Sequence, residues 1–180
     1  MIDIATLNRQ ELASYVGQTL EDHGVAVVLS GGSCVSIYSN ENYVSFDLDL
    51  IDVGYSNRKH IAGALSTIGY VSKGKGNRYF EHPDSAFSLE FPSAPLMIGD
   101  QVITGEGIDQ LETKLGIIRL LSPTNCVKDR LANYYYFNDI QCLHQARMVV
   151  QQQMVNANEL QLWLDSEGIE LLATELLKID

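Results

Sequence analysis

Two aspartates separated by one residue, Asp47 and Asp49, lie in the segment YVSFDLDLIDV at positions 43–53. Apolar and polar residues alternate along this segment, which predicts a strand with an apolar face and both carboxylates on the opposite face. The carboxylates would then lie about 6.5 Å apart. Like charges at this separation repel each other unless a cation lies between them, and Mg²⁺ binds carboxylates together with phosphate oxygens and water. The pair therefore predicts a magnesium site.

A third acidic residue, Glu90, is the only acid in the predicted strand AFSLEF at positions 86–91. The alternation places Glu90 opposite the apolar face of its strand, as it does the two aspartates. Three carboxylates on neighbouring strands can hold the metal ions used for in-line phosphoryl or nucleotidyl transfer. Asp84 and Glu81 compete for the third position, and a solvated strand face with no metal is the alternative for the whole set.

Residues that could bind phosphate precede the acidic strand. Gly31, Gly32 and Ser33 form a predicted turn between a buried strand at 25–30 and a short helix that runs to about residue 39. Backbone N–H groups at a helix N-terminus, together with a hydroxyl group, can bind phosphate oxygens. The segment is not a Walker loop, since no G-K-[ST] follows, and it has no G-x-G-x-x-G pattern. A plain helix cap is the alternative for Ser33.

The chain has one obvious basic cluster, Lys73, Lys75 and Arg78, with glycines between its members. We interpret it as a mobile loop that closes over an anionic substrate, and a solvated hairpin turn is the alternative. Arg78 is the member that we expect to bind substrate, because it begins a predicted strand and can be held rigidly.

The elements that must position these residues alternate between helix and strand up to residue 121. Capping residues and hydrophobic periodicity predict helices at 9–23 and 57–67, and strands at 70–73, 78–82, 86–91, 95–99 and in a hairpin over 101–121. Ser122 followed by Pro123 is a strong helix start, and further helices are predicted at 123–137, 139–154, 158–167 and 169–178. We therefore predict an α+β fold: a mixed sheet flanked by helices in residues 1–121, followed by a helical part in residues 122–180.

The charge balance excludes a general nucleic-acid-binding protein. Twelve Lys and Arg residues against 23 Asp and Glu residues give a net charge of −11, whereas binding to a phosphate backbone needs a basic field. The three cysteines are too few and too scattered for a disulfide framework or a zinc site. No apolar run reaches the roughly 18 residues that cross a bilayer, and the first residues lack the pattern of a signal peptide. We expect a cytoplasmic protein that does not bind membranes.

The order of these motifs, a glycine turn, a D-x-D strand and a third acid, resembles that of the nucleotidyltransferase superfamily, whose fold is shared with DNA polymerase β. The resemblance covers mainly residues 25–91, and it is closest to bacterial nucleotidyltransferases related to abortive-infection and toxin–antitoxin systems. It implies that Asp47, Asp49 and Glu90 are catalytic residues and metal ligands. It also points to Ser45, since a serine or threonine often stands two residues before the first aspartate in those relatives.

A softer match in the helical part implies that Lys128 reaches the triphosphate of a bound nucleotide. With Gly31, Gly32, Ser33, Ser45 and Arg78, Lys128 completes the expected nucleotide-binding residues. The expected activity is transfer of a nucleotide from an NTP to a hydroxyl group with Mg²⁺ or Mn²⁺, and tRNA, a protein or a small molecule is the acceptor. Two alternatives stay open: a non-catalytic nucleotide-binding or toxin–antitoxin-type regulatory protein of the same fold, and an unrelated α/β domain with a structural acidic strand.

Overall fold

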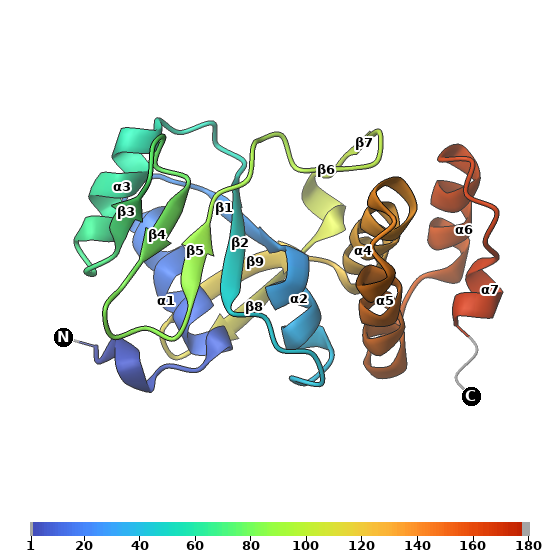
Figure 1. Ribbon diagram of the computed structural model, residues 1–180, viewed down its shortest axis with the longest axis horizontal. Coiled ribbons are helices and arrows are strands. Elements are labelled where there is room, and N and C mark those ends of the chain that lie inside the picture. The colour runs from blue at the N-terminus through green and yellow to red at the C-terminus, as the bar shows by residue number, and fades with distance from the viewer. Residues whose placement is uncertain (1, 178–180) are drawn as a thin grey trace.

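A mixed sheet of seven strands is the central element of the computed structural model, which describes residues 2–177 (Figure 1). From edge to edge its strands are β3 (Val71–Lys73), β4 (Tyr79–Glu81), β5 (Ser88–Glu90), β2 (Asp47–Asp52), β1 (Val27–Ser30), β9 (Gly116–Leu121) and β8 (Ile108–Thr113). β2 is parallel to β5 and β1 is parallel to β9, whereas the other neighbours are antiparallel. A separate hairpin pairs β6 (Met97–Ile98) with β7 (Gln101–Val102).

Helices cover the sheet, and further helices lie beyond one end of it. In chain order they are α1 (Arg9–Asp22), which follows a short 3-10 helix at Ile4–Thr6, α2 (Gly31–Tyr38), α3 (Arg58–Ser66), α4 (Pro123–Phe137), α5 (Ile140–Gln152), α6 (Ala157–Ser166) and α7 (Ala173–Leu176). α1 packs on β9 and α3, while α2 lies between the sheet and the pair α4 and α5. In Figure 1, α6 and α7 lie farthest from the sheet. The predicted α+β fold, a mixed sheet flanked by helices, is confirmed.

The helix boundaries follow from local capping. Asn8 accepts a hydrogen bond from the Glu11 amide, and the Glu11 carboxylate accepts one from the Asn8 amide, which closes a capping box at the start of α1. Gly24 has a φ of +73° just after this helix, a conformation that favours glycine. Ser122 caps α4 in the predicted way, with Pro123 in its first turn. No helix within residues 2–177 is long and apolar enough to cross a membrane.

The main departure from the sequence prediction is the strand expected at 43–53. β2 begins only at Asp47, and the preceding residues form a loop in which Val44 and Phe46 are 51% and 68% exposed. The predicted apolar face was therefore wrong for these two residues. The physical reason is that hydrogen bonds with α1 and α2 fix the path of residues 43–45, and bonding to β5 begins only at the Phe46 carbonyl, which accepts from the Ser88 amide at 3.0 Å.

Smaller departures concern turns and ends. The expected turn at 31–33 is already helical, because α2 begins at Gly31 directly after β1. The hairpin expected at 101–121 is shorter: β8 pairs with β9, whereas β7 pairs back to β6. The last predicted helix, 169–178, is reduced to α7 at Ala173–Leu176, and position 178 lies outside the described residues.

Candidate active site

The strand register brings the three predicted acids together. In the parallel pair β2 and β5, Asp49 lies opposite Glu90, and in the antiparallel pair β1 and β2 it lies opposite Ser30. One carboxylate oxygen from each of Asp47, Asp49 and Glu90 lies within 4.8 Å of the others. Within residues 2–177 this is the only group of three or more acidic, histidine or cysteine side chains that lie this close together. Asp84 and Glu81, the alternatives for the third position, are not part of this group.

Gly31 lets the second aspartate approach the start of α2. Its φ is +64°, in the left-handed region that favours glycine, and a Cβ atom at this position would overlap the Asp49 carboxylate. Asp49 therefore lies directly against the backbone of the first turn of a helix, where N–H groups and the helix dipole favour negative charge. The glycine that the sequence suggested for phosphate binding thus also makes room for a carboxylate.

The electrostatics of the three acids favour binding of a cation. Burial raises the pKa of Asp49 to about 7, with further upward contributions from the charges of Asp47 and Glu90. Arg130 lowers the pKa of Asp49, and Asp129 raises it by a still smaller amount. A divalent cation between the carboxylates would offset both the desolvation and the mutual repulsion. The donor set, three carboxylates, suits Mg²⁺ or Mn²⁺.

Ser33 and Ser45 both contact the first aspartate. Ser33 is buried and donates its hydroxyl hydrogen bond to the backbone carbonyl of Asp47, whereas Ser45 donates to the Asp47 carboxylate. A Cβ atom at Gly32 would lie 3.1 Å from the Ser45 hydroxyl and 3.2 Å from a ring carbon of Tyr43. Gly32, Ser33 and Ser45 therefore attach α2 to the start of the acidic strand. Phosphate binding by Ser33 stays a prediction.

The two predicted basic residues lie in different places. Arg78 is next to the acids: its Nε and Nη2 atoms donate to Glu90 Oε1 at 3.1 and 2.7 Å, and this bond raises the pKa of Arg78. Lys128 instead pairs with an acid of α6. It is buried, and its ammonium group donates to Glu159 of α6 at 2.7 Å. Contact between Lys128 and a triphosphate stays a prediction.

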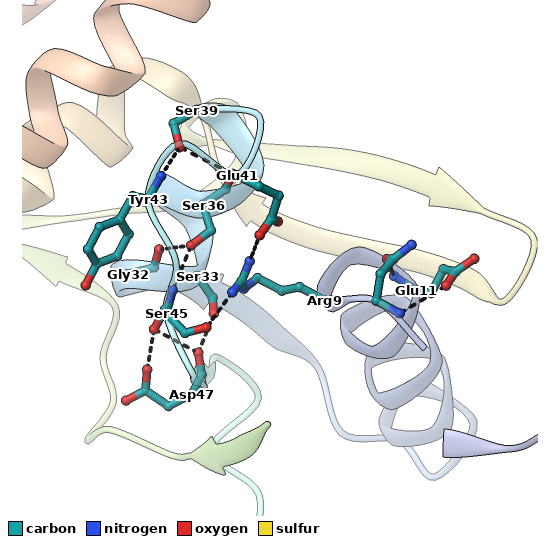
Figure 2. A network of polar contacts seen from close by, with 11 residues as sticks. Arg9, Glu11, Gly32, Ser33, Ser36, Ser39, Glu41, Tyr43, Ser45 and Asp47 are labelled. Atoms are coloured by element: carbon teal, nitrogen blue, oxygen red, sulfur yellow. Dashed lines mark hydrogen bonds and ion pairs between the residues drawn. The ribbon is translucent and has the colours of Figure 1, made fainter. Parts of the chain in front are cut away.

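The sequence prediction missed the polar network behind the acids, which Figure 2 shows. Ser36 and Ser39 accept hydrogen bonds from the amides of Ser45 and Tyr43 at 3.2 and 3.3 Å. With Ser33 they recur at every third position of SCVSIYS, a spacing that aligns three hydroxyls along one side of a helix and could have indicated the network. Arg9 also belongs to it, but a charged residue in a first helical turn is ordinarily read as solvated.

A cavity of about 460 Å³ lies between the β6–β7 hairpin and α4. Its lining includes the acidic side chains of Asp100 and Asp129, the amide of Asn133 and the aromatic rings of Tyr136 and Phe137. The Asp129 carboxylate accepts hydrogen bonds from the Arg130 guanidinium group at 2.5 and 3.1 Å. The cavity therefore offers carboxylates and aromatic faces.

Comparison with known proteins places the fold. No protein-family model matches the chain, and no curated protein does. Among solved structures, an antigenic nucleotidyltransferase-like protein from Paracoccidioides brasiliensis is 13% identical with a TM-score of 0.60, over 88% of this chain and 86% of that one.

Two structures of ANT(2'')-Ia are also similar. The crystal structure in complex with adenylyl-2''-tobramycin is 12% identical with a TM-score of 0.54, over 93% of this chain and 95% of that one. The solution structure of the same antibiotic-resistance factor is 14% identical with a TM-score of 0.51, over 93% and 89%. These likenesses extend over most of each chain, and they show that this chain has the fold of nucleotidyltransferase-like proteins.

Proposed function

We propose that the chain is a nucleotidyltransferase that moves a nucleotide from an NTP to a hydroxyl group of an acceptor. The observation that carries this proposal is the convergence of Asp47, Asp49 and Glu90 at the N-terminus of α2. A cluster of three carboxylates favours a bound cation, and a helix N-terminus with a glycine at its start suits the phosphates that accompany such a cation. In this chain the carboxylate cluster and the start of α2 lie side by side.

The three carboxylates would hold Mg²⁺ or Mn²⁺. The ion, when bound, supplies positive charge that neutralises and orients the phosphates of the NTP. Asp47 is oriented for this role by the Ser45 hydroxyl, and Asp49 by its position against Gly31. Backbone N–H groups of the first turn of α2 would bind phosphate oxygens.

Arg78 and Glu90 have linked parts in the proposed reaction. Arg78 now donates to Glu90, and its long side chain is half exposed, so it can turn toward phosphate oxygens when the NTP binds. Glu90 would then accept the proton of the acceptor hydroxyl. The acceptor oxygen bonds to the α-phosphorus, the bond from that phosphorus to the bridging oxygen breaks, and pyrophosphate leaves. The contribution of these residues is positioning and charge stabilisation.

For the acceptor we propose a cationic small molecule that carries hydroxyl groups. The cavity between the β6–β7 hairpin and α4 presents Asp100, the Arg130-paired Asp129 and aromatic rings, and the chain as a whole has a net charge of −11. Carboxylates and aromatic faces attract cations, and such a field increases the rate at which they arrive. The similar protein ANT(2'')-Ia was solved with adenylyl-2''-tobramycin. The toxin–antitoxin relationship, a tRNA or protein acceptor and a cytoplasmic location stay predictions from the sequence.

The test is incubation of the protein with each labelled NTP, Mg²⁺ and either a panel of hydroxylated amines or a cell extract. We expect a labelled small molecule with the wild type and with Asp84→Ala, which changes an exposed acid of the adjacent segment. Asp47→Ala should give no product. Label in RNA or protein would overturn the proposed acceptor class, and an equal yield with Asp47→Ala would overturn the proposed site.

A further inference from the structure

Arg9 occupies an unusual position for an arginine. It is the first residue of α1 and is only 2% exposed, although long charged side chains at helix ends ordinarily lie in water. Its guanidinium group donates to the Glu41 carboxylate and to the Ser45 backbone carbonyl, and lies 5.1 Å from the centroid of the Phe87 ring. The side chain thus joins α1 to the loop before β2 (Figure 2), and it also contacts the residue before β5.

Burial of this arginine is not explained by stability alone. Its Nε atom is buried and finds no hydrogen-bond partner among the described residues, and the partner carboxylate of Glu41 is more than half exposed. Buried charges in such settings can often be replaced by apolar side chains without loss of stability. What an apolar residue cannot do is hold two oxygens at once, which the planar guanidinium group does.

One of these two oxygens belongs to Ser45, the residue whose hydroxyl orients Asp47. The Ser45 carbonyl accepts from Arg9, its amide donates to Ser36 at 3.2 Å, and its hydroxyl donates to the Asp47 carboxylate. All hydrogen-bonding groups of Ser45 are therefore engaged, which leaves the residue one orientation. In this orientation it directs the first acid of the possible metal site.

Polar contacts are also the main constraint on this loop. Val44 and Phe46, which flank Ser45, are exposed, so burial of apolar side chains does not fix the segment immediately around it. We infer that Arg9 is a positioning residue that sets the affinity of the acidic site for divalent cations by holding Ser45 against Asp47. This inference rests on the proposed function, because it presupposes that the three carboxylates bind a metal ion.

The test is a titration of the full-length protein with Mn²⁺, with free Mn²⁺ measured by EPR and no nucleotide present. Removal of groups that orient metal ligands typically weakens metal binding about 10–100-fold, so we expect about tenfold weaker binding for Ser45→Ala and for Arg9→Met. Arg9→Lys should lose less Mn²⁺ affinity than Arg9→Met, because the ammonium group keeps the charge. It should still bind Mn²⁺ more weakly than the wild type, because it cannot hold both oxygens in one plane. Arg9→Lys and Ser45→Ala decide the question if Arg9→Met does not fold.

The double variant distinguishes positioning from a separate structural effect. If Arg9 acts through Ser45, adding Arg9→Met to Ser45→Ala should change the Mn²⁺ affinity less than twofold. The matched control is Arg119→Met, since Arg119 also contacts α1, through bonds of 2.7 and 3.1 Å to Glu21, and it should leave Mn²⁺ binding unchanged.

Two results would overturn the inference while leaving the proposed function intact. One is a wild type that binds Mn²⁺ with the same affinity as a folded Arg9→Met variant, and the other is a double variant in which the two losses multiply. Failure of the wild type to bind Mn²⁺ at all would instead reject the metal site itself, and the role of Arg9 with it.

Discussion

Replacement of Asp49 by asparagine should stabilise the metal-free protein at pH 8. Asp49 has a pKa of about 7 in the folded chain against an ordinary 3.8, because it is buried and faces Asp47 and Glu90. The native state therefore binds a proton that the unfolded chain releases, and stability falls as pH rises between about 4 and 7. A difference of about three pKa units corresponds to about 4 kcal/mol, which is the largest stabilisation that we expect from Asp49→Asn at pH 8.

Urea unfolding in EDTA measures this effect. Far-UV circular dichroism and the fluorescence of Trp163, the only tryptophan of the chain, report the transition. The stability gap between Asp49→Asn and the wild type should be large at pH 8 and small at pH 4, since Asp49 is protonated at pH 4 in the folded state. Asp84→Asn, at an exposed position, is the matched control and should show no such change. An equal gap at both pH values would refute the reasoning that Asp49 is destabilised by its charge.

Three further variants test other parts of the site. Gly31→Ala should lower stability by about 1–2 kcal/mol because of its left-handed φ, and it should also displace Asp49 and weaken Mn²⁺ binding. Gly24→Ala has a similar φ but open space around it, so it should affect stability alone. Equal Mn²⁺ affinities in the two variants would contradict the close approach of Asp49 to Gly31. Arg78→Gln removes the partly exposed ion pair with Glu90, so it should strengthen Mn²⁺ binding in the absence of nucleotide about two- to fivefold and weaken NTP binding. A weaker Mn²⁺ affinity would contradict the proposal that Arg78 moves from Glu90 to the phosphates. Lys128→Met should leave Mn²⁺ affinity unchanged, because the Lys128 ammonium group is paired with Glu159 of α6; a change in that affinity would link Lys128 to the acids.

The acidic cluster could be predicted in part from the sequence, because the face on which each acid lies follows from a short-range regularity. Alternation along a strand fixes the face of Asp47, Asp49 and Glu90, and pairing of two such strands brings those faces together. The same alternation failed at Val44 and Phe46, where contacts from distant residues override it. Local periodicity carries no information about those contacts.

Arg9 illustrates what sequence reasoning could not supply. Its partners, Glu41, Ser45 and Phe87, are more than 30 residues away along the chain, and each lies in a segment whose path is fixed only in the folded structure. The position of Lys128 depends in the same way on packing of α6 against α4, which the helix prediction alone does not define. Helix starts, by contrast, were predictable because their capping residues are adjacent in sequence.

The most direct test of the central claim is calorimetric titration of the protein with each NTP, with Mg²⁺ and with EDTA. The wild type should bind at least one NTP only when Mg²⁺ is present, and Asp47→Ala should lose this binding while its circular dichroism spectrum and thermal unfolding show an intact fold. NTP binding that is equal in the wild type and Asp47→Ala, or that persists in EDTA, would contradict a nucleotide site built on Asp47, Asp49 and Glu90.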